Sequence, residues 1–388
     1  MSISVAAVSE AFEKRFGAKP ELVVRAPGRV NIIGEHTDYN HGFVLPMAIE
    51  RETTIAGRRR DDGLICARAE NLNRDVTVRL DERVRNAAEP WIDYIMGVVD
   101  ELCKADKVPC GADIVILGDV PLGCGLSSSA ALEMAALCLF EELGGFTFDG
   151  PEAARFGQRV ENQFLGLKSG IMDQFISRCG RADHGLFLDC RSFAYDLVPI
   201  SFDNALFVIA NTKCARGLTA SKYNERVAEC GEAVAALCAG TGREGTHLRD
   251  FTLKDLEACR GGMGDIAFRR ARHVITEDVR TQQACAAMRA GDKVTLGRFM
   301  TASDISLRDD YEVTSPELNA MADTARSLPG CHGARMTGAG FGGCTINLVD
   351  ADQADGFCAA LMEGYTKATG LVGEVILSRP ADGAGRMV

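Results

Sequence analysis

One segment in the first third of the chain limits the possible folds more than any other. An apolar run at residues 112–117 leads through a glycine-containing turn into a stretch at 127–143 that is rich in Ala, Leu, Met and Glu. The run predicts a strand, and the stretch predicts a long helix. The first N–H groups of such a helix lack partners within it, and its dipole adds about half a positive charge there. The junction is therefore an anion site in outline.

The residues of this junction, Pro121-Leu-Gly-Cys-Gly-Leu-Ser-Ser-Ser-Ala130, have two interpretations. In the first, a serine caps the helix after a tight turn and no ligand is bound. In the second, Gly123 and Gly125 let the backbone approach a phosphate closely, and serine hydroxyls contact phosphate oxygens or Mg²⁺. One hydroxyl is enough for a cap, so three consecutive serines favour the phosphate site.

Two common phosphate-binding motifs are absent from the sequence. The chain has no Gly-Lys dipeptide, hence no Walker A sequence, and it has neither the His-Arg-Asp nor the Asp-Phe-Gly of protein kinases. Gly338, Gly340 and Gly343 match the spacing of a dinucleotide-binding motif, but residues 344–349 have the pattern of a strand where that motif needs a helix. We interpret this glycine run as a sharp turn near another segment or a ligand.

The densest group of polar side chains follows the apolar pair Ile32-Ile33. Glu35, His36 and Asp38 lie close together within the segment 28–40. Carboxylates accept hydrogen bonds from sugar hydroxyls, and an imidazole can donate or accept, so the loop suits a polyhydroxyl ligand. The alternative is a solvated turn with local hydrogen bonds. A zinc site at His36 is disfavoured, because no second histidine has the required spacing.

A third polar candidate is Asp173, which lies within residues 170–175 at the predicted start of a helix. Glu161 precedes it on another predicted helix. A carboxylate at a helix N-terminus usually does no more than stabilise the helix dipole. Asp173 therefore needs a partner before it indicates chemistry.

Length, composition and charge exclude several classes of protein. The chain has 388 residues, 46% apolar and 25% charged, which at about 150 residues per domain predicts two or three compact units rather than disorder. It has no run of about 18 apolar residues, so we expect no membrane span. Lys and Arg number 43 against 54 Asp and Glu, and the net charge of −11 repels a polyphosphate backbone. We expect no nucleic-acid partner.

Cysteine usage and the N-terminal residues predict a cytoplasmic protein. The 15 cysteines are scattered through apolar segments without a Cys-x-x-Cys pair, as is typical of core thiols in a reducing compartment. The first residues lack the basic start and apolar stretch of a secretory signal. An organelle lumen of similar redox state is the alternative.

The hydrophobic patterns predict helices and strands in both halves of the chain. We expect helices at 5–16, 127–143, 151–165, just after Gly170, and at 219–238, 265–290 and 316–327. We expect strands at 22–24 and 32–33 around a turn at Pro27-Gly28, and at 112–117, 186–198 and 206–209. Because strands and helices do not alternate regularly, the class is α+β rather than α/β. Without a linker, the two domains are expected to be 1–195 and 196–388.

Taken together, these segments resemble the GHMP small-molecule kinases. The similarity extends over nearly the whole chain and covers residues 25–29, 28–40, 121–132, 170–175, 221–224, 306–313 and 336–344. It implies an N-terminal domain like the second domain of ribosomal protein S5, a ferredoxin-like C-terminal domain and an active site between them. The segment 28–40 is similar to the sugar signature of the members that phosphorylate galactose.

The resemblance implies a reaction and its cofactor. The γ-phosphoryl group of MgATP would pass to the anomeric hydroxyl of α-D-galactose, giving galactose 1-phosphate and ADP, the first step of galactose catabolism. Asp173 would be the base. Arg29 would be its charged neighbour, lowering the pKa of Asp173 and stabilising the transition state. Whether Asp173 removes the proton or only orients the hydroxyl stays open.

The resemblance also assigns binding residues. The implied sugar contacts are Glu35, His36, Thr37, Asp38, Gly170, Asp173 and Tyr223. The implied nucleotide contacts are Trp91, Gly123, Cys124, Gly125, Leu126, Ser127, Ser128 and Ser129. The implied Mg²⁺ ligands are Ser129 and Glu161.

Departures from the family pattern are few, and two alternative functions stay open. Cys124, Ala339, His41 and Ser169 stand where relatives often have other residues, and an exposed Cys124 thiol would be sensitive to oxidation. A sister kinase acting on N-acetylgalactosamine or another sugar is one alternative. A regulator that senses sugar and ATP without turnover is the other, but the intact Ser129-Ala130 pair favours an enzyme. The expected partners are galactose and ATP, and we expect a monomer or weak dimer.

Overall fold

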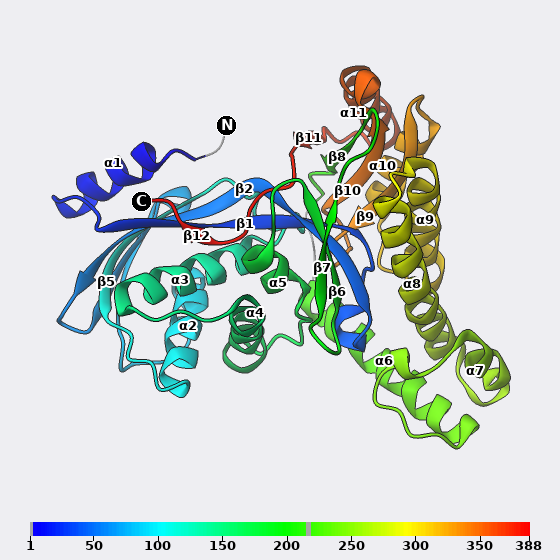
Figure 1. Cartoon of the computed structure of the whole chain (residues 1–388), viewed down its shortest axis with the longest axis horizontal. Coiled ribbons are helices and arrows are strands. Elements are labelled where there is room, and N and C mark those ends of the chain that lie inside the picture. The colour runs from blue at the N-terminus through cyan, green and yellow to red at the C-terminus, as the bar shows by residue number, and fades with distance from the viewer. Residues whose placement is uncertain (1–2, 215–218) are drawn as a thin grey trace.

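The computed structural model describes residues 3–214 and 219–388 and arranges them around two β-sheets. Figure 1 shows the first sheet with its helices in one part of the molecule, and the second sheet with the helices of the later chain in the other. Both parts combine helices with strands in irregular order, which confirms the α+β class. Among the described residues, no helix is both long and apolar enough to cross a bilayer.

The first sheet is formed mainly by the N-terminal half. Its strands are β1 (Leu22–Ile33), β2 (Phe43–Arg60), β3 (Leu64–Ala69), β4 (Arg74–Arg79), β5 (Gly111–Gly118) and the short β12 (Gly385–Arg386). Their order is β12-β1-β2-β5-β3-β4. A hairpin of β6 (His184–Asp189) and β7 (Tyr195–Pro199) extends from β2. Because β12 pairs with β1, the C-terminus returns to the first sheet.

Both faces of this sheet are covered. Successive strand residues point to opposite faces, so each strand contributes to two cores. Val24, Ile55 and Ile114 pack with α2 (Asp93–Lys104), α3 (Ser128–Gly144) and α4 (Gly150–Arg159). Val23 and Ala56 pack with α1 (Val5–Phe16) on the other side. Figure 1 shows α1 separated from the other helices by the sheet.

The structure corrects the prediction of two short strands around a turn at Pro27-Gly28. β1 is continuous across this point, where its pairing with β2 shifts register between Pro27 and Arg29 without a break in the strand. A Cβ at Gly28 would lie 2.6 Å from the carbonyl oxygen of Leu126, and the Arg29 N–H donates to the same oxygen at 3.0 Å. Gly28 therefore serves the close approach of β1 to the glycine-serine junction, not a turn.

Two further predicted elements are divided in the structure. The helix predicted at 151–165 is α4 followed by a π-helix, η4 (Val160–Leu165). The strand predicted at 186–198 is the β6–β7 hairpin, whose turn includes Phe193 at φ 60°. The helix expected after Gly170 is α5 (Met172–Cys179). Short π-helical segments are often found at functional sites, and Glu161 lies in this one.

The second sheet has strands β8 (Ala205–Asn211), β9 (Cys331–Thr337), β10 (Cys344–Asp350) and β11 (Glu374–Leu377) in the antiparallel order β11-β8-β10-β9. This is the strand order of a ferredoxin-like domain. Helices α10 (Pro316–Ser327) and α11 (Ala354–Thr369) cover one face, and α8 (Asp265–Arg289) and α9 (Lys293–Ser306) the other. The remaining helices are α6 (Thr219–Thr241) and α7 (Leu253–Ala258). The glycine run joins β9 directly to β10. The strand expected at 344–349 is therefore confirmed as β10.

The two parts share a hydrophobic core. Ile32 and Leu45 of the first sheet belong to the same buried cluster as Met288 of α8 and Ile346 of β10. The domain boundary near residue 195 stays a prediction. Because β7 begins there and still pairs with β6, we propose that the boundary lies within 200–204, before β8 begins.

Candidate active site

A cavity of about 280 Å³ lies where the two parts of the chain meet. It is lined by residues of β1, the loop after it, α3, η4, α5, α6 and the turn after β9. The predicted residues that line it are Arg29, Glu35, His36, Asp38, Ser129, Glu161, Gly170, Asp173 and Tyr223. Thr37 does not line it. That side chain is buried, and its hydroxyl contacts the carbonyl oxygens of Gly34 at 2.9 Å and Phe43 at 2.7 Å, so Thr37 shapes the loop.

Arg29 and Asp173 form a two-pronged ion pair in this cavity. Nε of Arg29 donates to Oδ1 of Asp173 at 2.8 Å, and Nη2 donates to Oδ2 at 2.7 Å. The Arg29 side chain is 5% exposed, but that of Asp173 is 30% exposed. Burial opposes the charge of Arg29, yet Asp173 and Glu35 raise its pKa above the ordinary value. Asp173 thus has the charged neighbour that the family resemblance implied, and its side chain lines the cavity.

The glycine-serine junction contacts the same ion pair. The hydroxyl of Ser127 donates to Oδ2 of Asp173 and makes no helix-capping hydrogen bond, which excludes the simple cap interpretation for Ser127. Nη1 of Arg29 donates to the carbonyl oxygen of Gly125. Gly123 and Gly125 have φ of 70° and 83°, a region that favours glycine. Cys124 is buried, and its thiol donates to the Pro121 carbonyl oxygen at 3.1 Å.

Asp38 and Gly170 fit against each other in the lining of the cavity. Asp38 begins a short 3₁₀ helix, η1 (Asp38–Asn40). A Cβ at Gly170 would collide with the Asp38 carboxylate, so only glycine leaves room for it. Burial, and then the neighbouring charge of Asp173, raise the pKa of Asp38 to about 7. The cavity therefore contains two interacting carboxylates with different surroundings.

His36 is held as a neutral ring by partners within the protein. Its Nε2 lies 3.2 Å from the Ala339 carbonyl oxygen, which can only accept, so Nε2 carries the proton. Its Nδ1 then accepts from the Tyr39 hydroxyl at 2.9 Å, and that hydroxyl lies 2.6 Å from the hydroxyl of Tyr311. Burial lowers the pKa of His36 to about 3. The ring of Tyr223 lies beside it, with the two centroids 5.6 Å apart.

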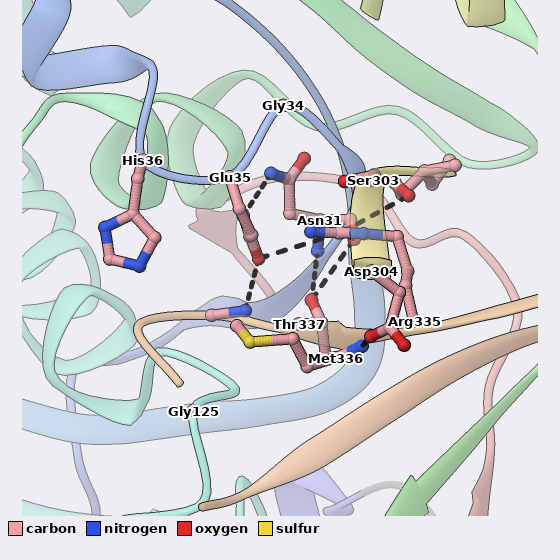
Figure 2. A network of polar contacts seen from close by, with 12 residues as sticks. Asn31, Gly34, Glu35, His36, Gly125, Ser303, Asp304, Arg335, Met336 and Thr337 are labelled. Carbon is pink, nitrogen blue, oxygen red and sulfur yellow. Dashed lines mark hydrogen bonds and ion pairs between the residues drawn. The ribbon is translucent and has the colours of Figure 1, made fainter. Parts of the chain in front are cut away.

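Glu35 lies in a network of polar contacts that links β1 to β9 (Figure 2). Its carboxylate accepts from the side-chain amide of Asn31 and from the backbone N–H of Gly338. Thr337 adds a further link, since its hydroxyl accepts from the Asn31 N–H at 2.9 Å. The carboxylate is therefore held in one orientation before any ligand binds.

Ser129 and Glu161, the residues implied as Mg²⁺ ligands, lie on the same cavity. Behind them, Gln174 donates to Oε2 of Glu133 at 3.0 Å, and Oε1 of each of these two buried side chains lacks a hydrogen-bond partner. The hydroxyl oxygen of Ser129 and the carboxylate oxygens of Glu161 fit a hard cation that keeps several waters. Within residues 3–214 and 219–388, no three His, Cys, Asp or Glu side chains form a metal site of their own.

A second cavity, of about 680 Å³, adjoins the first. Its lining is largely apolar and aromatic and includes the predicted Trp91 together with Tyr94, Ile116 and Leu132. Ser128 and Ser129 line it too, and Ser129 is shared by both cavities. A ligand that extends from the second cavity along the glycine-serine junction therefore reaches the first at Ser129.

Several residues around these cavities were missed by the sequence analysis. They are Tyr39, Asn71, Tyr94, Glu133, Lys168, Gln174, Tyr311 and Arg335. Glu133 stands four residues after Ser129, a helical spacing that places both on one face, so this one had a detectable signal. The others come from segments whose position depends on packing.

Comparison with known protein families gives three matches along the chain. Residues 10–59 match the galactokinase galactose-binding signature. Residues 93–181 match the GHMP kinases N terminal domain, and residues 284–367 match the GHMP kinases C terminal domain. Every predicted sugar residue of the first loop lies within the first match.

Individual relatives are similar over almost their whole length. Galactokinase of Roseiflexus sp. (strain RS-1) is 44% identical over 98% of this chain and 96% of its own. Galactokinase of Homo sapiens is 43% identical over the same shares. The crystal structure of Lactococcus lactis galactokinase complexed with galactose superposes with a TM-score of 0.94, at 37% identity over 98% of this chain and 99% of that one.

Proposed function

Because this chain belongs to the galactokinase family and is therefore a kinase, we propose that it transfers the γ-phosphoryl group of ATP to the anomeric hydroxyl of α-D-galactose. The products are galactose 1-phosphate and ADP. The observation that supports this best is the Arg29–Asp173 pair, which stands in one cavity with Glu35 and Asp38 and beside Ser129. That arrangement puts an acceptor for a sugar proton next to the residue shared by both cavities.

We propose that the smaller cavity binds the sugar. The carboxylates of Glu35 and Asp38 accept hydrogen bonds from sugar hydroxyls, and Gly170 leaves room for the Asp38 carboxylate. Tyr223 packs against the ring of the sugar. His36, whose two nitrogens already have protein partners, contacts the sugar through its ring face or backbone.

Asp173 and Arg29 then act on the reacting atoms. The anomeric hydroxyl gives its proton to Asp173 as its oxygen bonds to the γ-phosphorus, and the bond from that phosphorus to the β–γ bridging oxygen breaks to release ADP. Arg29 keeps Asp173 in place and offsets negative charge on the moving phosphoryl group. Such reactions depend mostly on positioning and charge neutralisation.

The larger cavity and the junction are proposed to bind ATP. Trp91 and its apolar neighbours line the space for the adenine ring, and the backbone of 123–129 faces the phosphates. Ser129 and Glu161 are the residues that would hold Mg²⁺, and Glu133 and Gln174 support them from behind. When bound, Mg²⁺ neutralises charge on the phosphate oxygens.

The deciding experiment is an initial-rate measurement of ADP release across a sugar panel with MgATP. We expect galactose to be turned over fastest, ahead of N-acetylgalactosamine, glucose and arabinose. A preference for N-acetylgalactosamine would indicate the sister kinase, and sugar binding without ADP release would indicate a sensor.

We also propose that the protein acts in the cytoplasm as a monomer or weak dimer. Light scattering after size-exclusion chromatography tests the oligomeric state.

A further inference from the structure

Behind Glu35, buried charged side chains alternate in sign from the cavity into the C-terminal half. Glu35 is followed by Arg335 on β9, by Glu277 on α8 and by Arg280 one turn later on α8. Arg335 and Glu277 are both 0% exposed. Burying charges this deeply costs free energy unless each has partners. Arg335 has the Asn31 and Ile32 carbonyl oxygens and the Glu35 carboxylate as partners, and Glu277 is paired with Arg280.

Glu277 holds the peptide group between Ile33 and Gly34, just upstream of Glu35. Its Oε1 accepts from the Gly34 N–H at 3.0 Å and from the Ser303 hydroxyl at 2.6 Å, and its Oε2 accepts from Nε of Arg280 at 2.8 Å. Burial alone would raise the pKa of Glu277, but neighbouring positive charges, first that of Arg280, lower it to about 2. Glu277 is therefore ionised and a strong acceptor for the Gly34 N–H.

The backbone around Glu35 has little freedom to move independently of α8. Gly34 has φ 97°, and a Cβ there would lie 2.6 Å from the Phe43 carbonyl oxygen. On the other side, Nε2 of His273 lies 3.1 Å from the Glu35 carbonyl oxygen, to which it donates. Residues of α8 thus hold the Ile33–Gly34 peptide before Glu35 and the Glu35–His36 peptide directly after it.

Arg335 acts on the carboxylate itself (Figure 2). Its Nη1 donates to the Asn31 carbonyl oxygen at 2.9 Å and lies 3.9 Å from Oε1 of Glu35. Burial raises the pKa of Glu35, and the charges of Arg335 and Arg29 oppose that rise. With Asn31 and Gly338 as hydrogen-bond donors and Arg335 as an ion-pair partner at 3.9 Å, the carboxylate keeps about two of its roughly four acceptor positions for sugar hydroxyls.

We propose that Glu277 and Arg335 are positioning residues for sugar recognition, Glu277 by holding the Gly34 N–H and Arg335 by pairing with the Glu35 carboxylate. Neither lines the cavity, so each acts through Glu35. The inference rests on the proposed role of Glu35 as a sugar contact. Sugar affinity is then set in part by the C-terminal half, although Glu35 belongs to the N-terminal half.

The test compares Arg335→Met, Arg335→Lys and Glu277→Gln with the unaltered protein. We expect Arg335→Met to raise KM for galactose on the order of 10- to 100-fold, with KM for ATP changed by less than about twofold. Arg335→Lys should restore part of the galactose KM, because it keeps the charge but loses the geometry. Glu277→Gln should raise the galactose KM about fivefold through a weaker bond to Gly34.

The matched control is Asp113→Asn. Asp113 is another buried carboxylate paired with arginine, accepting from Nη1 of Arg60 at 2.7 Å, but it lies in the first sheet and lines neither cavity. This change should lower Tm and leave the galactose KM unaltered. Equal rises in both KM values for Arg335→Met, or a galactose-specific rise for Asp113→Asn, would overturn the inference.

Two further measurements keep the test decisive. If Arg335→Met does not fold, isothermal titration of Glu277→Gln with galactose decides, and an unchanged affinity overturns the inference. The unaltered protein is assayed first. If it releases no ADP with galactose, the proposed function fails, whereas normal turnover combined with unchanged KM values in the variants refutes only the positioning roles.

Discussion

The two cavities that meet at Ser129 are lined by different kinds of residue. The smaller cavity takes its lining from both halves of the chain. Its lining includes the charged side chains of Glu35, Asp38, Glu161, Asp173, Arg29 and Lys168. The larger cavity takes its lining from the N-terminal half and is mainly apolar and aromatic. Ser129 belongs to both.

The difference matches the ligands that we propose for the two cavities. A sugar offers hydroxyl groups in fixed directions, and each needs an oriented acceptor or donor. Orienting a buried carboxylate in turn requires partners from other segments, as Arg29 provides for Asp173 and Arg335 for Glu35. An adenine ring offers a flat face, for which a slot of apolar side chains is enough. The smaller cavity should therefore be more sensitive to single charge changes than the larger one.

The largest expected effect is on turnover. Asp173→Asn should lower kcat on the order of 10²- to 10⁴-fold with little change in nucleotide affinity, because the amide cannot accept the sugar proton. The control is Asp189→Asn, which removes an equivalent two-pronged pair with Arg249, at 2.8 and 3.1 Å, outside both cavities. Near-normal turnover of Asp173→Asn would remove this residue from the chemistry.

Glu161, which we propose as a Mg²⁺ ligand, gives the next largest effect. Glu161→Gln should raise the Mg²⁺ concentration for half-maximal rate on the order of 10-fold, since a neutral amide is a weaker ligand for a hard cation. Rates are measured against Mg²⁺ at fixed ATP. Glu141→Gln serves as control. Glu141 is a buried glutamate that accepts from Nη1 of Arg178 at 2.8 Å, and neither residue lines the two cavities. An unchanged requirement would reassign the ligand.

A reciprocal pair of variants tests whether the cavities are separate. Trp91→Ala should raise KM for ATP about 5- to 10-fold and leave the galactose KM unchanged, because it removes aromatic area only from the larger cavity. Tyr223→Ala should do the reverse. Steady-state kinetics with each substrate varied in turn gives both values. If either variant raised both KM values equally, the cavities would not divide the ligands as proposed.

The smallest effect sharpens the contrast through pH. Since the pKa of Asp38 is raised to about 7, this carboxyl is neutral below that pH and loses acceptor strength. The galactose KM should therefore rise up to about tenfold from pH 8 to pH 6, while the ATP KM lacks this step. Asp38→Asn should abolish the step.

Stability checks the same pKa independently. The folded state holds the Asp38 proton more tightly than the unfolded state does, so the contribution of this group to stability falls as pH rises from about 4 to about 7. At pH 8, Asp38→Asn should accordingly raise Tm. An unaltered Tm together with a flat galactose KM would show that Asp38 is ionised throughout.

Local features of the site were predictable from the sequence. The strand, the glycine turn and the serine-rich start of the helix form one contiguous segment. The hydrophobic period and the backbone preferences of neighbouring residues are enough to predict them. The glycine run after Met336 was correctly distinguished from a dinucleotide motif, because the strand pattern follows it directly. The polar segment 28–40 could be recognised for the same reason, because its residues are neighbours in the sequence.

Features that depend on distant contacts were not predictable. Gly28 was expected to make a turn, yet it lies in a continuous strand, because the reason for the glycine is the Leu126 carbonyl oxygen nearly 100 residues away. Ser127 was a candidate cap or phosphate ligand, and only the position of α5 shows that its hydroxyl also contacts Asp173.

The sequence by itself determined the class of fold, the strand-to-helix junction at 112–143 and the identity of most polar side chains that line the smaller cavity, since these follow from residue type and short-range spacing. Only the tertiary structure decided how those side chains are held. The guanidinium of Arg335 and the carboxylate of Glu277 come from segments far along the chain from Glu35, and packing brings them to it. The physical reason is that a charge removed from water must find its partners in space, and spatial neighbours are set by the whole fold.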